Sequence, residues 1–194
     1  FTLRKGEIHA LMGENGAGKS TLIKVLTGVY SKDEGEIRID GSAKAVAIHS
    51  PQDAQKLGIS TVYQEITLCP NLTVAENMFI GRTGGMLQNW KKLKNDTEKI
   101  LQSLEIPAKA TQQLETCSIA VQQMIAIARA VDMECKVLIL DEPTSSLDEQ
   151  EVAKLFKLMR NLREKGVGII FVTHFLDQVY EVCDRITVMR DGQL

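Results

Sequence analysis

Apolar residues follow two spacings along this chain, one typical of strands and the other of amphipathic helices. Short apolar or alternating runs predict strands at residues 7–12, 36–41, 59–63, 136–141, 167–172 and 186–190. Apolar residues three and four positions apart predict helices at residues 19–27, 93–104, 148–163 and 176–182. Alternating strands and helices indicate an α/β fold, a mainly parallel sheet with helices on both faces.

Capping patterns predict where several helices begin and end. Ser50, followed by proline, and Ser118 are each suited to the N-cap of a helix. Thr73 has a glutamate three residues later, which is the spacing of a capping box. Pro107 is predicted to end the helix that contains residues 93–104, and Gly166 to close the helix that begins near residue 148.

The chain divides into a core and an insertion. Residues 65–135 contain no convincing strand, so we interpret them as a helical subdomain between two parts of an α/β core, residues 1–64 and 136–194. A length of 194 residues suits a single domain. The chain begins at Phe rather than Met and ends in what resembles a turn entering a strand, so we expect a domain truncated at both ends.

Composition narrows the possible partners. The 25 acidic and 23 basic residues give a net charge of −2, which argues against a polyanion-binding surface and therefore against nucleic acid. Four cysteines stand singly, without metal-site spacing or disulfide density, a pattern that suits a reducing cytoplasm. Apolar runs are shorter than a membrane span, so we expect any membrane association to depend on a partner.

A phosphate-binding loop stands between the first predicted strand and the first predicted helix. It comprises Gly13, Glu14, Asn15, Gly16, Ala17, Gly18, Lys19 and Ser20, followed by Thr21. Glycines in this pattern let backbone N–H groups surround phosphate oxygens, and the helix adds its positive N-terminal end. We expect Lys19 to reach the terminal phosphates of a nucleotide and the Ser20 hydroxyl to complete the shell of a bound Mg²⁺.

Polar residues follow three other predicted strands. Asp141 and Glu142 end the strand at 136–141, where Asp141 is expected to hold Mg²⁺ and Glu142 to orient the attacking water. Gln64 follows the strand at 59–63, and its amide oxygen could also bind Mg²⁺ and sense that water. His174 follows the strand at 167–172, and a neutral imidazole there could donate to a γ-phosphate oxygen during cleavage.

In this order the motifs resemble those of the ATP-binding subunits of ABC transporters. The corresponding family motifs are the Walker A loop at 13–20, the Q-loop at Gln64, Walker B with its catalytic glutamate at 137–142, the D-loop at 145–148 with Ser146 and Asp148, and the switch His174. The resemblance covers essentially the whole chain. It implies a P-loop NTPase fold with a helical subdomain between Q-loop and signature motif, and an ATPase that uses ATP and Mg²⁺.

The family's signature motif, Leu-Ser-Gly-Gly-Gln, is altered here. Residues 117–121 read Cys-Ser-Ile-Ala-Val, so only Ser118 is kept. In the family this segment contacts the ATP held by an opposing subunit, which implies such a contact for Ser118, Ala120 and Gln122. Loss of both glycines puts in doubt the activity of the site that the segment completes. The family's adenine-stacking aromatic residue would precede Phe1.

This departure, together with residues 72–82, 141–147 and 170–180, resembles the first ATPase half of bacterial sugar importers of the ribose, galactose and galactofuranose type. That resemblance implies ATP hydrolysis that powers sugar import through an integral membrane permease. It also implies a second ATP-binding domain, an indirect periplasmic sugar-binding partner and a peripheral location on the cytoplasmic face of the bacterial inner membrane. The sugar itself stays open.

Three other readings compete with a sugar importer. A soluble ABC ATPase acting on nucleic acid or ribosomes would share the motifs, although the near-neutral charge disfavours it. A GTPase or small-molecule kinase would share the phosphate loop, but neither explains Gln64, Ser118 and His174 together. The third is a fragment that binds nucleotide without hydrolysing it.

Overall fold

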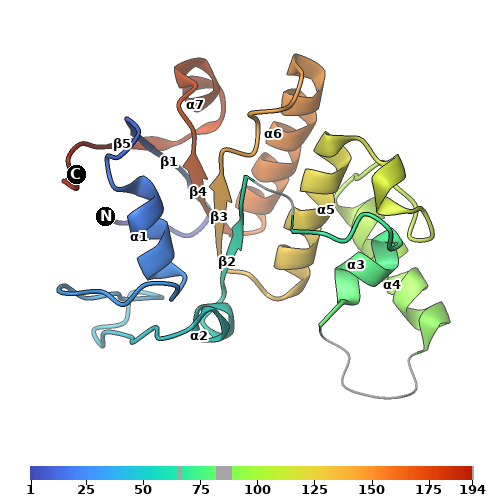
Figure 1. The fold of residues 1–194 in the computed structure, drawn as a ribbon, viewed down its shortest axis with the longest axis horizontal. Helices are drawn as coiled ribbons and strands as arrows, with labels where there is room; N and C mark the ends of the chain where they lie inside the picture. Colours follow the sequence, from blue (N-terminus) through green and yellow to red (C-terminus); the bar gives the residue numbers. More distant parts are fainter. Residues whose placement is uncertain (65–66, 82–88, 194) are drawn as a thin grey trace.

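A five-stranded parallel sheet lies at the centre of the computed structural model, which describes residues 1–64, 67–81 and 89–193 (Figure 1). The strands are β1 (Ile8–Gly13), β2 (Ile59–Val62), β3 (Val137–Asp141), β4 (Gly168–Val172) and β5 (Arg185–Met189). Their order is β2-β3-β4-β1-β5, and neighbouring strands pair in parallel. Parallel pairing requires crossovers over the faces of the sheet, which here are helical. The predicted α/β fold is confirmed.

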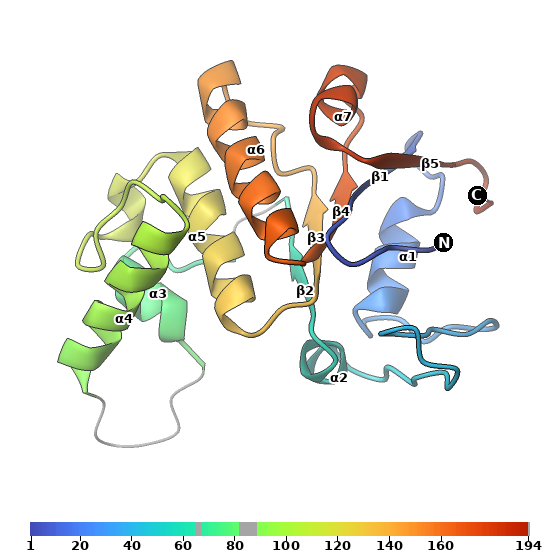
Figure 2. The ribbon, with the colours of Figure 1, turned by 180° about the vertical axis from the view of Figure 1, so that it is seen from behind.

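Helices cover both faces of this sheet. They are α1 (Lys19–Leu26), α2 (Pro51–Lys56), α3 (Val74–Phe79), α4 (Trp90–Ser103), α5 (Ile119–Asp132), α6 (Glu149–Glu164) and α7 (Leu176–Val182), with a 3₁₀ turn, η1 (Leu114–Thr116), before α5. Figures 1 and 2 show α1 and α2 on one side of the sheet, α5 and α6 on the other, and α3 and α4 beyond α5. Within the described ranges, no helix combines the length and apolar character needed to cross a bilayer.

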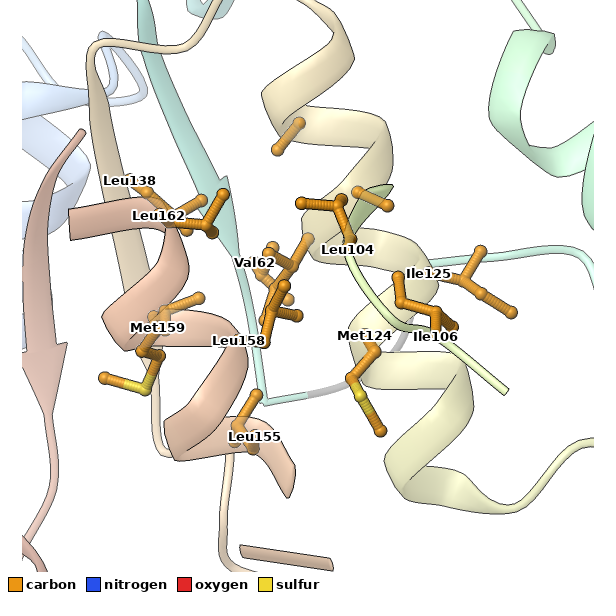
Figure 3. Close-up of a cluster of buried hydrophobic side chains, with 14 of the residues drawn as sticks. Val62, Leu104, Ile106, Met124, Ile125, Leu138, Leu155, Leu158, Met159 and Leu162 are labelled. Carbon is orange, nitrogen blue, oxygen red and sulfur yellow. The ribbon is translucent and has the colours of Figure 1, made fainter. Parts of the chain in front are cut away.

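The central strands are buried on both faces, as their apolar runs predict. In β3, Leu138 and Leu140 face the α5 and α6 side, whereas Ile139 faces the α1 side, and all three are fully buried. Figure 3 shows part of the larger cluster, in which Met124 of α5 and Leu158 of α6 are buried beside the sheet. Burying each such side chain contributes about 1.5–3 kcal/mol to folding. Both sheet faces therefore stabilise the strands that carry the polar residues.

The capping patterns are confirmed at four helices. Ser50 and Ser118 accept N–H groups at the starts of α2 and α5, and Thr73 forms the predicted capping box at the start of α3. Gly166 follows the last residues of α6 with a φ of 89°. These local signals fix helix ends because the bonded atoms lie within a few residues of each other.

In the described part of the segment between β2 and β3, the regular elements are the helices α3, α4 and α5 and the turn η1. Fully buried Asn77 anchors the start of this segment, because its Oδ1 accepts from the Cys69 N–H at 2.8 Å and its Nδ2 donates to the Cys69 carbonyl at 2.9 Å. The interpretation of residues 65–135 as a separate subdomain stays a prediction. Residues 65–66 and 82–88 of this segment lie outside the described residues. Residue 82 is also the last residue of the stretch at 72–82 that resembles sugar importers.

The predicted strand at residues 36–41 is wrong. Ile37 and Ile39 do pack against the core on the α1 side, as their alternation implies. However, the pairing in this segment is one isolated antiparallel bridge between Ile37 and Val46. A single two-stranded pairing is marginally stable in water, so alternation alone does not produce a strand here.

The prediction that Pro107 ends the preceding helix is also wrong. α4 ends at Ser103, and Glu105 has a left-handed φ of 55°. The Ile106 N–H donates to the Leu101 carbonyl at 2.9 Å, which closes the last turn, and both of these side chains are buried. A backbone hydrogen bond and an apolar contact therefore end the helix before the proline is reached.

A buried polar network joins β1 to the edge strand β5. His9, whose side chain is 1% exposed, bonds through Nε2 to the Thr187 hydroxyl at 2.7 Å, while Arg185 donates to its Nδ1 at 3.1 Å. Arg185 also pairs with Glu7 at 2.8 Å. Burial lowers the pKa of His9 and Arg185 lowers it further, whereas Glu7 acts in the opposite direction. The network therefore favours a neutral imidazole.

Stability is expected to fall on acidification because of His9. Its pKa in the folded state lies below the ordinary value of 6.5, so the unfolded chain binds the proton more readily. The neutral His9 side chain contributes to the free energy of unfolding above pH 6.5, and this contribution is lost as the pH falls through the folded-state pKa. Urea midpoints of the full-length protein, measured from about pH 8 to about pH 5.5, should fall more steeply for the natural sequence than for His9→Gln. The exposed-site control, His49→Gln, should follow the natural sequence; identical profiles for all three would contradict the assignment.

Candidate functional site

Left-handed glycines shape the loop between β1 and α1. Gly13, Gly16 and Gly18 have φ values of 153°, 85° and 102°, a region that side chains with a Cβ rarely adopt. A Cβ on Gly13 would lie 2.5 Å from the Met189 carbonyl oxygen. Ala17 anchors the loop to the segment after β5, because its carbonyl accepts from the Gly192 N–H at 3.0 Å. The sequence pattern of a phosphate loop therefore has the backbone shape that such a loop needs.

Lys19 lies within the turn of this loop. Its ammonium donates to the carbonyls of Gly13 and Glu14 at 2.6 and 3.0 Å. Ser20 and Thr21, in the first turn of α1, are exposed. The free N–H groups of a helix start and a nearby positive charge are features suited to an anion.

An open groove of about 800 Å³ borders the loop. Gly16, Gly18 and Thr21 line one end of it, and Tyr30 and Met189 contribute to its walls. The phosphate loop and the exposed side of α1 are therefore accessible from the same side of the molecule.

The carboxyl ends of the strands bring the other polar residues to the same edge. Leu11 of β1 and Asp141 of β3 both pair with Val172 of β4, so β3 and β4 end at the same level and β1 ends two residues beyond it, at Gly13. Glu142 and His174 follow directly, and His174 Nδ1 lies 3.4 Å from Glu142 Oε1. The structure therefore brings together two of the predicted residues that are 32 positions apart.

Gln64 follows β2, the strand next to β3 in the sheet. It follows β2 by two residues, and β2 pairs with β3 from Ile59 to Val62. Its position after the neighbouring strand agrees with the sequence-based expectation, and its role stays a prediction.

Glu142 adopts an uncommon backbone conformation. Its φ of 47° is left-handed, and its N–H donates to the Val172 carbonyl at 2.9 Å. A residue that is not glycine is strained by about 1–2 kcal/mol in this region, and such strain is often located at functional sites. The turn directs the Glu142 side chain toward His174 of the adjacent strand end.

Asp141 is affected by burial and by two charged neighbours. Burial raises the pKa of the Asp141 carboxyl, the Glu142 carboxylate raises it further, and the Lys19 ammonium lowers it. The influence of Lys19 connects the end of β3 to the phosphate loop electrostatically. A cation beside Asp141 would favour its charged form.

Oxygen atoms dominate the predicted metal-ligand set. Ser20 offers a hydroxyl, Gln64 an amide oxygen and Asp141 a carboxylate. Hard oxygen ligands of this kind suit Mg²⁺, which typically keeps several water molecules and binds through one or two carboxylates and the phosphates of its nucleotide. The chemistry of the donors therefore fits the predicted ion.

The altered signature segment opens α5. Ser118 accepts the Val121 N–H at 3.4 Å, and Gln122 donates to the Cys117 carbonyl at 3.0 Å. Ala120 is buried in the core, so only its backbone belongs to the exposed helix start. α5 lies on the opposite side of the sheet from α1 (Figure 1), so the structure does not bring this segment to the phosphate loop of the same chain.

The loop after Glu142 contains both the predicted D-loop and a contact that sequence analysis missed. Ser146 is exposed, and Asp148 caps α6 by accepting the Glu151 N–H at 2.8 Å. Buried Thr144 donates its hydroxyl to Gln178 Oε1 of α7 at 2.7 Å. These partners are 34 residues apart, and no spacing in the sequence indicates their contact.

Residues 1–145 match the ABC transporter family. The chain is 56% identical to the galactofuranose transporter ATP-binding protein YtfR of Escherichia coli K12, 52% to the fructose import ATP-binding protein FruK of Bifidobacterium longum and 47% to the ribose import ATP-binding protein RbsA 2 of Rhizobium etli. Those matches cover 99–100% of this chain and 38% of each relative. The chain thus spans less than half the length of these relatives.

Solved structures show the same fold. An ATP-binding cassette of an ABC transporter in its ADP conformation superimposes with a TM-score of 0.88 at 26% identity, covering 100% of this chain and 80% of that one. CbiO1 from Clostridium perfringens, described as part of an ABC transporter complex, gives a TM-score of 0.84 at 30% identity, covering 99% of this chain and 76% of that one. These comparisons confirm the sheet-and-helix architecture of the described residues.

Gly13→Ala is expected to destabilise the protein more than a glycine substitution in open space. The added Cβ would overlap the Met189 carbonyl, at a cost of about 1–3 kcal/mol beyond the backbone strain. Gly35→Ala is the matched control, since Gly35 has a left-handed φ of 82° but no atom within 4 Å of the new Cβ. Urea unfolding of the full-length variants measures the difference, and equal losses would show that the close approach does not matter.

Proposed function

This chain belongs to the ABC transporter family, and on that premise we propose that it binds and hydrolyses ATP to power the import of a sugar through a membrane permease. The observation that carries the catalytic part is the Glu142–His174 pair beside the phosphate loop. The sugar part rests on 47–56% identity to relatives described as galactofuranose, fructose and ribose transport proteins. Because the chain spans 38% of those relatives, the activity is proposed for the full-length protein.

ATP binding follows from the loop that precedes α1. Backbone N–H groups around the left-handed glycines and the N-terminal end of α1 hold phosphate oxygens, and residues 13–21 supply this cradle. Lys19 can exchange its bonds to the Gly13 and Glu14 carbonyls for terminal phosphate oxygens. The stronger charge of phosphate favours that exchange.

Mg²⁺ would be held by Ser20, Asp141 and Gln64 together with phosphate oxygens. When bound, the ion supplies positive charge that neutralises the β- and γ-phosphates. The Lys19 ammonium lowers the pKa of the Asp141 carboxyl, so this edge of the sheet would supply both a cation and a carboxylate ligand for Mg²⁺ near the phosphates.

Hydrolysis requires a positioned water and stabilisation of the γ-phosphate. Glu142 accepts a hydrogen bond from the attacking water and orients it. His174 can turn its N–H from Glu142 to a γ-phosphate oxygen, because their 3.4 Å contact is long for a hydrogen bond. The pair thus orients the nucleophile and stabilises the charge that develops on phosphate.

The second half of the ATP site comes from another ATP-binding domain. We assign Ser118, Gln122 and the backbone of Ala120 to contact with ATP held by that domain, with Ser146 and Asp148 of the D-loop at the same interface. The location of α5 across the sheet from α1 supports this assignment. Cycles of closure and opening then drive the permease, with a periplasmic sugar-binding protein delivering the sugar, at the cytoplasmic face of the bacterial inner membrane.

Glu142→Gln is expected to abolish turnover while leaving ATP binding intact. Removing the carboxylate removes the group that orients and deprotonates the water, so kcat should fall by about 100-fold or more. The Kd for ATP should change less than about threefold, since the phosphate contacts remain. Phosphate release and binding of a fluorescent ATP analogue to the full-length protein measure the two effects.

Glu164→Gln is the matched control, because Glu164 is exposed at the end of α6 and away from the sheet edge. It should hydrolyse ATP at the natural rate. Unchanged hydrolysis in Glu142→Gln would remove Glu142 from its assigned role.

Sugar import is expected to require both this chain and a polytopic membrane protein. Purification of the full-length protein from gently solubilised membranes should recover a permease. Proteoliposomes containing both, with the binding protein outside and ATP inside, should accumulate one of labelled galactofuranose, ribose, fructose or galactose, and Glu142→Gln should prevent this. Recovery of ribosomes or nucleic acid in place of a permease would overturn the transport assignment.

A further inference from the structure

The two loops that carry Glu142 and His174 need support from other residues. The Glu142 side chain is 26% exposed and that of His174 is 56% exposed, so both groups are accessible to solvent. Their mutual contact is 3.4 Å, which is weak. Groups below the surface can help to keep these loops in register.

Backbone contacts supply part of that support. The Glu142 N–H donates to the Val172 carbonyl at 2.9 Å, which continues the β3–β4 pairing by one residue. Thr173, 1% exposed, accepts the Phe175 N–H at 3.1 Å and so shapes the turn that contains His174. These bonds hold the base of each loop, but they end before the loops enter α6 and α7.

Thr144 and Gln178 join the two loops beyond that point. Thr144 follows Glu142 by two residues and is 3% exposed, while Gln178 follows His174 by four residues in the first turn of α7. The Thr144 hydroxyl donates to Gln178 Oε1 at 2.7 Å, an ideal hydrogen-bond distance. Because the Thr144 hydroxyl belongs to a buried residue, losing the bond leaves that hydroxyl without this acceptor.

We propose that Gln178 is a positioning residue for ATP hydrolysis, which acts through Thr144 to hold the Glu142 loop at a set distance from His174. The inference rests on the proposed ATPase function. Gln178 touches neither the nucleotide nor the water in this assignment; its amide oxygen accepts one hydrogen bond that links the two loops. Misplacement of a reacting group by about 1 Å can lower a rate about 100-fold, so a link of this kind affects kcat.

Gln178→Leu in the full-length protein tests the proposal. It keeps the side-chain volume and removes the acceptor, so kcat should fall about tenfold, while the KM for ATP stays within about twofold. Tyr180→Leu is the control on the same helix, since Tyr180 is 71% exposed, and it should leave kcat unchanged. An unchanged kcat in Gln178→Leu, or a loss confined to KM, would overturn the proposal.

Substitutions of Thr144 separate positioning from a general packing effect. Thr144→Val removes the hydroxyl at equal volume and should lower kcat about tenfold, as Gln178→Leu does, whereas Thr144→Ser keeps the donor and should restore kcat to within about threefold of the natural rate. The double variant Thr144→Val/Gln178→Leu should lose no more than either single variant, because both remove one bond. A loss near 100-fold, the product of two independent effects, would contradict a shared bond.

Two further measurements keep failure of this inference distinct from failure of the ATPase assignment. If the natural protein hydrolyses ATP and Glu142→Gln does not, the ATPase assignment stands, and the Gln178 variants then decide the inference alone. If the natural protein does not hydrolyse ATP, both fail. Urea unfolding of the natural protein, Thr144→Val, Gln178→Leu and the double variant gives a check that does not depend on activity. Additive losses in the free energy of unfolding would show that the bond is absent in solution.

Discussion

Parallel pairing of β1, β4 and β3 is the constraint on which the site depends. Val172 pairs with Leu11 on one side and Asp141 on the other, so β3 and β4 end at one level and β1 ends two residues beyond it. The phosphate loop, His174 and Glu142 all follow within two residues of that level. A shift of one strand by a single residue would turn its side chains to the opposite face and expose its core residues, so core packing and site geometry depend on the same register.

The proposed functional side chains are accessible to solvent, whereas the groups that hold their loops in place lie below them. Glu142 and His174 must remain accessible, so other groups hold their loops: Thr144 with Gln178 between the loops, and the backbone bond to Val172 below them. Polar pairs in a low-dielectric interior are costly to break and therefore specify one arrangement. The His9 and Arg185 network acts similarly at β5, whose turn also contacts the phosphate loop.

The position of α5 explains why one chain forms only part of our proposed site. Its exposed helix start and the phosphate loop are separated by the sheet, and no local rearrangement of Ser118 would join them. A second domain that presents its own α5 to this phosphate loop would supply the missing contacts. With Ile119 and Ala120 replacing the glycines of the family motif, the ATP site completed by this chain's α5 would lack both of those glycines.

Local chemistry in the sequence determined the phosphate loop, the capped helices and the buried strands. Each rests on residues a few positions apart: glycines at 13, 16 and 18 set backbone angles, and Thr73 reaches its own helix. Only the tertiary structure decided the rest. It placed His174 beside Glu142 and Gln178 against Thr144, prevented a strand at 36–41, and ended α4 before Pro107. Those outcomes depend on strand register and packing between distant segments, which no local spacing encodes.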